Sequence, residues 1–464
     1  MLRSRTITDW DPEDIVAWEA RNKYIARRNL LWSVVAEHVG FSVWTMWSVM
    51  VLFMPEDVYG FSAGDKFLLG ATATLVGGCL RVPYTLATAK FGGRNWTVFS
   101  AFVLLIPTLG TMWLLAHPGL PLWPYLLCAA VGGFGGGNFA SSMTNINAFY
   151  PQRLKGWALG LNAGGGNIGV PVLQLVGLLV IATAGNRSPY WVCAVYLVLL
   201  AVAAIGAALF MDNLEQHQID TTAMRSILSI RDTWVIALLY IGTFGSFIGF
   251  SFAFGQVLQI NFVTGGQSPA DAALHAAQIA FIGPLLGSIA RVYGGKLADR
   301  VGGGRVTTVV FGGMILAGAL LIAVSSYQGR AGGPVGTATM IGFVGGFVAL
   351  FVLSGVGNGS VYKMIPSIFD ARSRSLIGSE ADKQQWSRAM SGALIGFAGA
   401  VGALGGVGIN LALRQSYLSS GSATAAFWIF LAFYALAMTL TWYRYVRTPS
   451  ERQSTPSMLD SVLR

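Results

Sequence analysis

The chain contains 464 residues, of which 54% are hydrophobic and only 11% are charged. An ordinary soluble domain has roughly 25% charged residues, so this chain cannot cover its surface with polar groups, and a soluble fold is excluded. The net charge of +10 would suggest a nucleic-acid partner in a soluble protein. Here the basic residues fall between apolar stretches, so we expect the lipid bilayer as a partner and no nucleic acid.

The sequence shows no residue pattern typical of catalysis or metal binding. Cys79, Cys128 and Cys193 all lie inside apolar segments without paired spacing, which argues against a disulfide framework or a zinc site. The sequence contains no nucleotide-binding loop, metal cluster or nucleophile motif. We therefore expect neither an enzyme nor a bound cofactor.

The first 29 residues form a polar leader rather than a short apolar run with a small-residue cleavage site, so no signal peptide is expected. Residues 11–14 (Asp-Pro-Glu-Asp) are typical of a helix start, and apolar side chains follow at Ile15, Trp18 and Ile25. We expect a cytoplasmic segment at residues 1–29 that contains an interfacial helix. A merely solvated leader is the alternative.

About twelve apolar stretches are long enough for a helix to cross a hydrocarbon layer about 30 Å thick. Their expected centres are Trp44, Gly77, Leu105, Gly133, Gly169, Leu200, Phe247, Leu285, Leu316, Gly346, Gly402 and Phe433. Lys and Arg gather in one set of loops and at both termini, whereas the opposite loops carry only Lys66, Arg187, Arg330 and Arg414. By the positive-inside rule, both termini should be cytoplasmic, in a multi-pass protein of the bacterial inner membrane.

The chain also contains an internal repeat. A cytoplasmic linker at residues 212–232 separates a first half at 30–211 from a second half at 233–446, and a cytoplasmic tail follows at 447–464. Residues 135–138 (Gly-Gly-Gly-Asn) correspond to 355–358 (Gly-Val-Gly-Asn), and Arg81 corresponds to Arg291. Two homologous six-span halves imply a substrate site at their interface, near the bilayer midplane.

Arg81 and Arg291 each lie well inside an apolar span. An arginine there costs about 2.5–3.5 kcal/mol even on the lenient insertion scale, so a functional role is the default. Glu37 is the one clear acidic residue within a span, and a single carboxylate cannot neutralise two guanidinium groups. Two planar cationic groups without partners favour a small anion with oxygens for bidentate hydrogen bonds. The alternative is that either arginine snorkels or binds backbone carbonyls.

Two further features belong to the same interpretation. The glycine-rich segment before Asn167 would allow close helix packing and bring the Asn167 amide towards the cavity.

Residues 294–305 resemble the conserved cytoplasmic loop of the major facilitator superfamily, with Asp299 and Arg300 as its charged core. We expect these two residues to belong to a latch that is released when the halves rock, and a purely topological role is the alternative.

Residues 139–143 (Phe-Ala-Ser-Ser-Met), 149–151 (Phe-Tyr-Pro) and 164–169 (Gly-Gly-Gly-Asn-Ile-Gly) resemble the nitrate signature of the nitrate/nitrite porter family. Residues 355–360 and 364–366 resemble its counterpart in the second half, and the similarity to these NarK-type porters covers essentially all twelve spans. The resemblance implies an all-α membrane protein with the major facilitator fold, in which twelve transmembrane helices form two pseudo-symmetric six-helix halves.

The resemblance also implies roles for individual residues. Arg81 and Arg291 would clamp the anion, Asn167 and Tyr240 would form hydrogen bonds with it, and Phe139 and Phe244 would pack against its faces. Aromatic rings on both faces would admit flat nitrate or bent nitrite and exclude tetrahedral anions. Without the resemblance, helix packing would explain both phenylalanines.

We expect alternating access in which the halves rock around this site. Two arginines that repel each other in an empty dry cavity favour nitrate/nitrite exchange, which needs no titrating side chain. A nitrate/proton symporter is the alternative, with Glu37 and His38 as the best titrating pair. An anion channel or nitrate sensor is a further alternative, disfavoured by the twofold repeat and by the lack of an appended soluble domain. One chain holds both halves of the site, so we expect a functional monomer.

Overall fold

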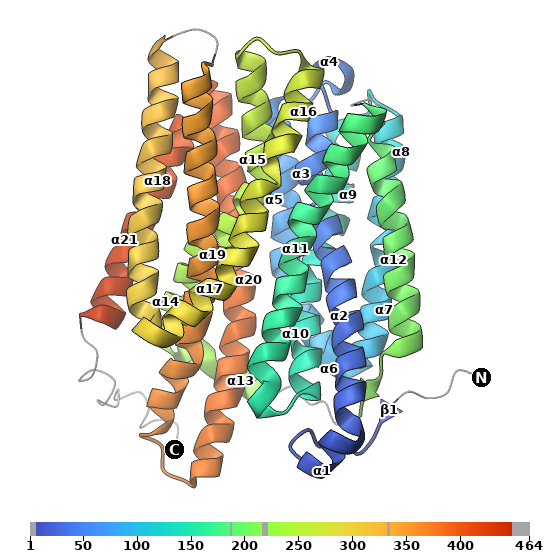
Figure 1. Ribbon diagram of the computed structural model, residues 1–464, viewed down its shortest axis with the longest axis vertical. Helices are drawn as coiled ribbons and strands as arrows, with labels where there is room; N and C mark the ends of the chain where they lie inside the picture. Colours follow the sequence, from blue (N-terminus) through green and yellow to red (C-terminus); the bar gives the residue numbers. More distant parts are fainter. Residues whose placement is uncertain (1–5, 186–187, 216–220, 332–334, 448–464) are drawn as a thin grey trace.

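The computed structural model describes residues 6–185, 188–215, 221–331 and 335–447 (Figure 1). Long helices dominate, and β1 (Thr6–Ile7) and β2 (Asn213–Leu214) form one short parallel pair. Except for its first residue, the expected tail at 447–464 lies outside the described residues, as does Arg187.

The first half of the chain forms one bundle. Its helices, in chain order, are α1 (Ile15–Ala17), η1 (Trp18–Asn22), α2 (Lys23–Trp44), α3 (Trp47–Met50), η2 (Val51–Phe53), α4 (Glu56–Tyr59), α5 (Ala63–Cys79), α6 (Arg81–Phe91), α7 (Gly93–Val103), α8 (Leu105–Ala116), α9 (Leu122–Gly132), α10 (Phe134–Phe149), α11 (Gln152–Ala184) and α12 (Tyr190–Phe210).

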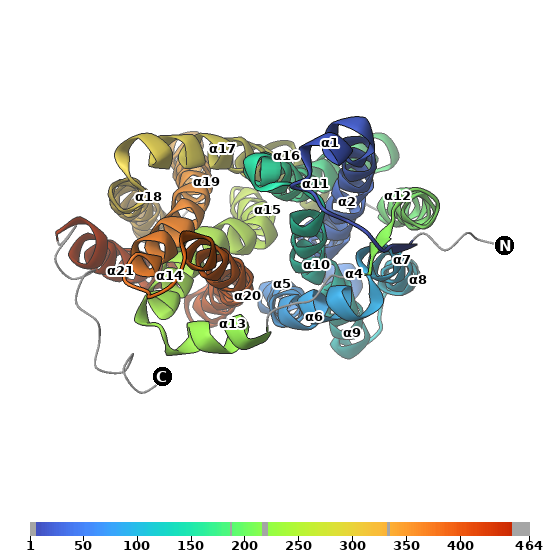
Figure 2. The ribbon, with the colours of Figure 1, turned by 90° about the horizontal axis from the view of Figure 1, so that it is seen from below.

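The second half forms another bundle beside the first (Figure 2). Its helices are α13 (Thr221–Ser226), η3 (Ile227–Ser229), α14 (Arg231–Tyr240), η4 (Ile241–Gly245), α15 (Ser246–Thr264), α16 (Pro269–Ala280), α17 (Ile282–Val301), α18 (Gly303–Ala331), α19 (Thr337–Ser373), α20 (Glu380–Ser420), α21 (Thr424–Thr441) and η5 (Trp442–Val446).

Among the described residues, ten helical stretches are long and apolar enough to cross a membrane, or eleven if α5 and α6 are joined across their 42° bend. The remaining expected span, centred near Gly133, is divided at that glycine into α9, with 11 residues, and α10, with 16. Neither piece alone is long enough to span, and the Gly, Asn and Ser residues of α10 lower its hydropathy. The repeat, rather than hydropathy, identifies these two helices as the fourth span.

The N-terminal segment packs against protein at the end of the first bundle. Asp14 caps α1 by accepting hydrogen bonds from the backbone of Val16 and Ala17, and α1 continues through η1 into α2. Trp18 is buried and packs edge-to-face on Tyr150, with ring centroids 5.7 Å apart. The helix expected in this segment is therefore continuous with the first span.

The two halves meet along two sets of helices. α5 packs along α20, and α11 packs against α16 and α17. At the end that carries α4, Phe67 stacks on Tyr417 with ring centroids 5.5 Å apart. A Cβ added at Gly64 would lie only 2.9 Å from Leu418 Cδ2. The halves are therefore tightly closed against each other at this end.

The opposite end of the same helices is less tightly covered. A Cβ added at Gly156 or Gly160 of α11 would have no heavy atom within 4 Å. The same holds at Gly392 and Gly396 of α20. These helix faces border open space, whereas the faces near α4 are filled by the partner half.

Each half also joins its first span to its last by an ion pair at the end opposite α4. In the first half, Arg28 of α2 binds Asp212, just after α12, with an N···O distance of 2.6 Å. In the second half, Asp232 of α14 binds Arg444 of η5 at 3.0 Å, and Arg372 of α19 at 2.9 Å. The pairs occupy equivalent places in the repeat, with the signs of the charges exchanged.

Candidate functional site

Arg81 lies at a break in the second span, and the residues around it produce this break. Pro83 has no N–H group with which to bond the carbonyl of Cys79, and its ring crowds that carbonyl. α5 therefore ends at Cys79, and α6 begins at Arg81 after a bend of 42°. The Arg81 side chain is 1% exposed and lies between the halves.

The Arg81 guanidinium is only partly satisfied by protein. Nη1 donates a 2.8 Å hydrogen bond to the carbonyl oxygen of Gly399 on α20. The guanidinium carbon lies 4.7 Å from the ring centroid of Phe139 and 4.8 Å from that of Phe244. Nε and Nη2 are buried and have no hydrogen-bond partner among the described residues. Buried donors are normally paired, so two unpaired nitrogens on one cation mark a place for an acceptor.

Arg291 of α17 reaches the same aromatic group from the second half. Its guanidinium carbon lies 6.0 Å from the ring centroid of Phe139 and 5.2 Å from that of Tyr362. Nη2 lies 3.5 Å from the hydroxyl oxygen of Tyr240, at the limit of a hydrogen bond, and Nη1 is buried without a partner. Both arginines therefore lie against Phe139, as the repeat leads us to expect.

Phe139 and Phe244 form an aromatic pair beside the arginines, which we call the aromatic slot. The rings of Phe139 and Phe244 have centroids 6.4 Å apart and are inclined by 32°. Both distances to the Arg81 guanidinium exceed half of that separation, so the cation lies to one side of the two rings rather than between them. Phe244 belongs to the π-helical turn η4, a distortion common at functional sites, and stacks on Tyr240 at 5.2 Å.

Asn167 lies on α11 and is 1% exposed, and both of its amide atoms lack hydrogen-bond partners. No hydrogen bond thus connects it to the arginines or to Tyr240. The adjacent Gly166 faces Glu37, because a Cβ there would overlap Oε1 of that carboxyl group. The structure therefore places Asn167 on the part of α11 that lies beside Glu37 and shows no contact of its amide with the two arginines.

Glu37 and His38 occupy a separate polar site within the first half. Glu37 accepts hydrogen bonds from Ser142 and from Asn162, and its Oε1 is unpaired. In the part of the chain that the structure describes, Glu37 forms no hydrogen bond or ion pair with Arg81 or Arg291. His38 Nδ1 lies 3.1 Å from the carbonyl oxygen of Gly165.

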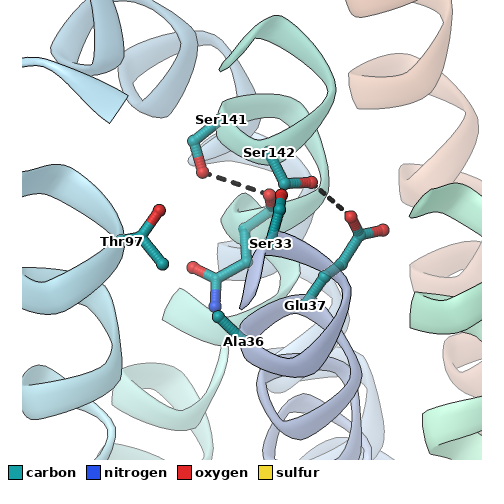
Figure 3. Close-up of a pocket in the computed structure, with 7 residues that line it drawn as sticks. Ser33, Ala36, Glu37, Thr97, Ser141 and Ser142 are labelled. Carbon is teal, nitrogen blue, oxygen red and sulfur yellow. Dashed lines mark hydrogen bonds between the residues drawn. The ribbon is translucent and has the colours of Figure 1, made fainter. Parts of the chain in front are cut away.

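Glu37 also lines a cavity of about 10 Å³, room for about one water molecule. Its other lining residues are Ser33, Ala36, Thr97, Asn138, Ser141 and Ser142 (Figure 3).

Asp299 and Arg300 lie at the exposed end of α17. Asp299 forms an ion pair of 3.0 Å with Lys363 of α19, and both side chains are about half exposed. This pair connects two helices of the same half. The sequence analysis named Asp299 and Arg300 for the latch and did not identify Lys363 as the partner of Asp299.

Three more residues contact the arginines and were not singled out from the sequence. Trp44 lies 5.7 Å from the Arg81 guanidinium, Tyr362 lies against Arg291, and Gly399 accepts from Arg81. The repeat could have drawn attention to one of them. Tyr362 follows Asn358 in the second half at the same spacing as Ser142 follows Asn138 in the first half. No pattern distinguishes Gly399 from the other glycines of its span.

Comparison with known proteins agrees with this architecture. A sequence model described as Major Facilitator Superfamily matches residues 38–407. The solved structure of the nucleoside transporter NupG superposes with a TM-score of 0.61 at 13% identity, and the match covers 90% of this chain and 100% of NupG. The protein is therefore a multi-pass membrane transporter with the major facilitator fold.

Relatives of higher sequence identity indicate the family of transporters to which the chain belongs. The nitrate/nitrite transporter NarU of Escherichia coli is 35% identical over 95% of this chain and 96% of its own length. The probable nitrate/nitrite antiporter NarK2 of Thermus thermophilus is 33% identical over 96% of this chain and 98% of its own length. The chain belongs to the nitrate/nitrite porter family of the Major Facilitator Superfamily.

Proposed function

We propose that this protein exchanges nitrate for nitrite across a membrane by alternating access around Arg81 and Arg291. The observation that carries the proposal is a set of three buried guanidinium nitrogens, two on Arg81 and one on Arg291, for which the described part of the chain offers no hydrogen-bond partner. A guanidinium group stays charged in proteins and presents N–H donors in a planar fork. An anion with coplanar oxygens would satisfy these donors.

The aromatic slot supports a flat ion. Optimal contact between carbon atoms is about 3.5–4.0 Å, so a planar ion needs rings roughly 7 Å apart. The separation of 6.4 Å between Phe139 and Phe244 requires only a small opening for such an ion. A tetrahedral sulfate or phosphate would need much more. Nitrate or nitrite held between these rings would place oxygens beside Arg81.

The names of the relatives support the same substrates. NarU is named as a transporter of nitrate and nitrite, and NarK2 as a probable antiporter of the two. These relatives span nearly the whole chain, so the likeness includes both halves of the proposed site. We assign Asn167 and Tyr240 as additional hydrogen-bonding groups for the anion.

Exchange follows from the charges of the site. If the halves rock about the contacts of α5 with α20 and of α11 with α16 and α17, both arginines must enter a closed site in every crossing. Two unneutralised guanidinium groups repel each other there, and burial strengthens the repulsion. A bound anion removes much of this cost, so the loaded carrier crosses more readily than the empty one.

The proposal includes location and assembly. The loop distribution of Lys and Arg supports a bacterial inner membrane protein with both termini in the cytoplasm. Both halves of the site lie in one chain, so a monomer suffices for transport. The pair of Asp299 with Lys363 and the neighbouring Arg300 form a cytoplasmic latch whose rearrangement accompanies rocking.

The test is uptake of labelled nitrate by proteoliposomes that contain nitrite, contain no anion substrate, or maintain an inward proton gradient. We expect strong stimulation by internal nitrite and little uptake into vesicles without it. Uptake driven by the proton gradient alone would refute exchange and support symport through the buried Glu37. Uptake without any trans-stimulation would instead indicate a channel.

A further inference from the structure

Tyr362 of α19 presents an unpaired hydroxyl group to the arginines. Its ring lies 5.2 Å from the Arg291 guanidinium and packs edge-to-face on Tyr240, with centroids 4.6 Å apart. The ring is thus held on two sides. Its hydroxyl oxygen is buried near the Tyr240 hydroxyl, and it has no hydrogen bond of normal geometry to any described residue. Because packing fixes the ring, the hydroxyl is a positioned donor.

Gly399 shows where that hydroxyl lies relative to the first arginine. A Cβ added at Gly399 would lie 3.3 Å from the Tyr362 hydroxyl oxygen and 3.1 Å from Arg81 Nη1. The same position is 3.9 Å from the Phe139 ring. The hydroxyl therefore shares one small volume with a donor of Arg81 and an edge of the aromatic slot. Only a residue without a side chain leaves this volume free.

A second unpaired group lies on the same face of α19. Asn358 precedes Tyr362 by four residues, a spacing that places both on one side of a helix. Its side chain is fully buried, and neither amide atom has a hydrogen-bond partner within the ranges that the structure describes. An unsatisfied buried polar group costs about 1–3 kcal/mol, and phenylalanine would fill the place of Tyr362 without that cost. A hydroxyl retained here indicates an acceptor that arrives with the substrate.

Nitrate and nitrite differ in the number of oxygen atoms that they offer as acceptors. Both can present two oxygens to an arginine fork, but only nitrate has a third. We propose that the Tyr362 hydroxyl donates to this third oxygen and so makes the site prefer nitrate over nitrite. The inference depends on the proposed function, because it concerns the anion held by Arg81 and Arg291.

The variant Tyr362→Phe removes the hydroxyl and keeps the ring that packs on Arg291 and Tyr240. The assay is exchange of labelled nitrate in nitrite-loaded proteoliposomes, with unlabelled external nitrate or nitrite as competitor. We expect the half-inhibiting concentration of nitrate to rise about tenfold, which corresponds to ~1.4 kcal/mol, while that of nitrite changes little. An equal change for both anions, or no change for either, would overturn the proposal.

Tyr150→Phe is the matched control. Tyr150 is buried at the end of α10, and its hydroxyl also lacks a partner, but it packs on Trp18 away from the arginines. This variant should leave both inhibition constants unchanged. Should Tyr362→Phe fold poorly, Tyr362→His supplies a ring N–H donor, and it should keep more of the nitrate preference than Tyr362→Leu does.

The outcomes separate this inference from the function on which it depends. If the unmodified protein shows no nitrate/nitrite exchange, the proposed function fails. If the unmodified protein exchanges the anions and Tyr362→Phe does so with the same preference, the transport function stands and only the role of Tyr362 is refuted.

Discussion

The guanidinium of Arg81 donates a 2.8 Å hydrogen bond to the carbonyl oxygen of Gly399, so a charged side chain of one half is fastened to the backbone of the other. This bond crosses the surface along which the halves must move. When they separate, Arg81 loses its protein acceptor and depends on the anion. Substrate recognition and closure of the carrier therefore share one side chain.

Replacing either arginine by lysine tests the planar forks. Arg81→Lys and Arg291→Lys keep the charge but lose the pair of parallel N–H donors. A hydrogen bond to a charged group contributes ~1.5–3 kcal/mol, so each variant should lose at least about tenfold in apparent nitrate affinity in the exchange assay. Arg330→Lys, at the exposed end of α18, is the control. Full activity of both site variants would refute the clamp.

Gly399→Ala should impair transport by filling the site. The new methyl group would lie 3.1 Å from Arg81 Nη1 and 3.3 Å from the Tyr362 hydroxyl, in the volume available to an anion oxygen. Alanine favours a helix over glycine by about 1 kcal/mol, so thermal stability should not fall. Gly396→Ala, on the same helix with open space around its Cβ, should retain exchange. Equal activity of the two variants would show that this volume is not used.

A disulfide between α5 and α20 should stop the carrier. Gly64 and Leu418 face each other closely at the end that carries α4, and the Gly64→Cys, Leu418→Cys variant would bring two thiols within bridging range. The variant should be built in a background that lacks Cys79, Cys128 and Cys193. Oxidation should abolish exchange, and reduction should restore it. Continued exchange by the fully oxidised protein would exclude separation of the halves at this end.

Glu37→Gln distinguishes exchange from proton symport. The glutamine oxygen can still accept from Ser142 and Asn162, but the side chain can no longer take up or release a proton. For an exchanger, we expect little change in the KM for nitrate or in the turnover, because exchange needs no titrating side chain. Exchange should persist without a proton gradient. If Glu37 carries the coupled proton, gradient-driven uptake by the unmodified protein should disappear in the variant.

Asp232→Asn should reduce stability more than substrate affinity. The Asp232 carboxylate binds Arg372 and Arg444, and it accepts a 3.1 Å hydrogen bond from the Tyr445 hydroxyl. Breaking a buried ion pair costs ~3–5 kcal/mol. Because both arginines are about one-third exposed, we expect a loss nearer ~2 kcal/mol. A lower melting temperature in detergent, with nitrate affinity unchanged, is the expected result.

Much of the fold follows from hydropathy and the internal repeat. The charged residues Arg81 and Arg291 are conspicuous because each interrupts an apolar span, and the structure brings both against Phe139. Hydropathy alone fails for the span near Gly133, because its glycines and asparagine pack against other helices instead of facing lipid. The repeated Gly-rich pattern places this span.

The details of the site are less predictable. Phe139, Phe244 and Tyr240 are ordinary apolar or aromatic residues in their spans, and only the family resemblance gave them roles. Gly399 contributes a backbone carbonyl and an absent side chain, neither of which produces a pattern. Asp232 was assigned to a linker boundary because its partners, Arg372 and Arg444, are 140 and 212 residues away in the chain.

The two bundles carry equivalent ion pairs with reversed signs of charge, and these pairs have a consequence for how the protein assembles. One ion pair joins the first and last spans within each half: Arg28 with Asp212 in the first, and Asp232 with Arg444 in the second. Neither half therefore needs a charged residue of the other half to form this contact. Each half can thus complete its fold without waiting for the other. Two separately translated polypeptides, cut between these pairs, should then find each other in the bilayer and reconstitute a working carrier.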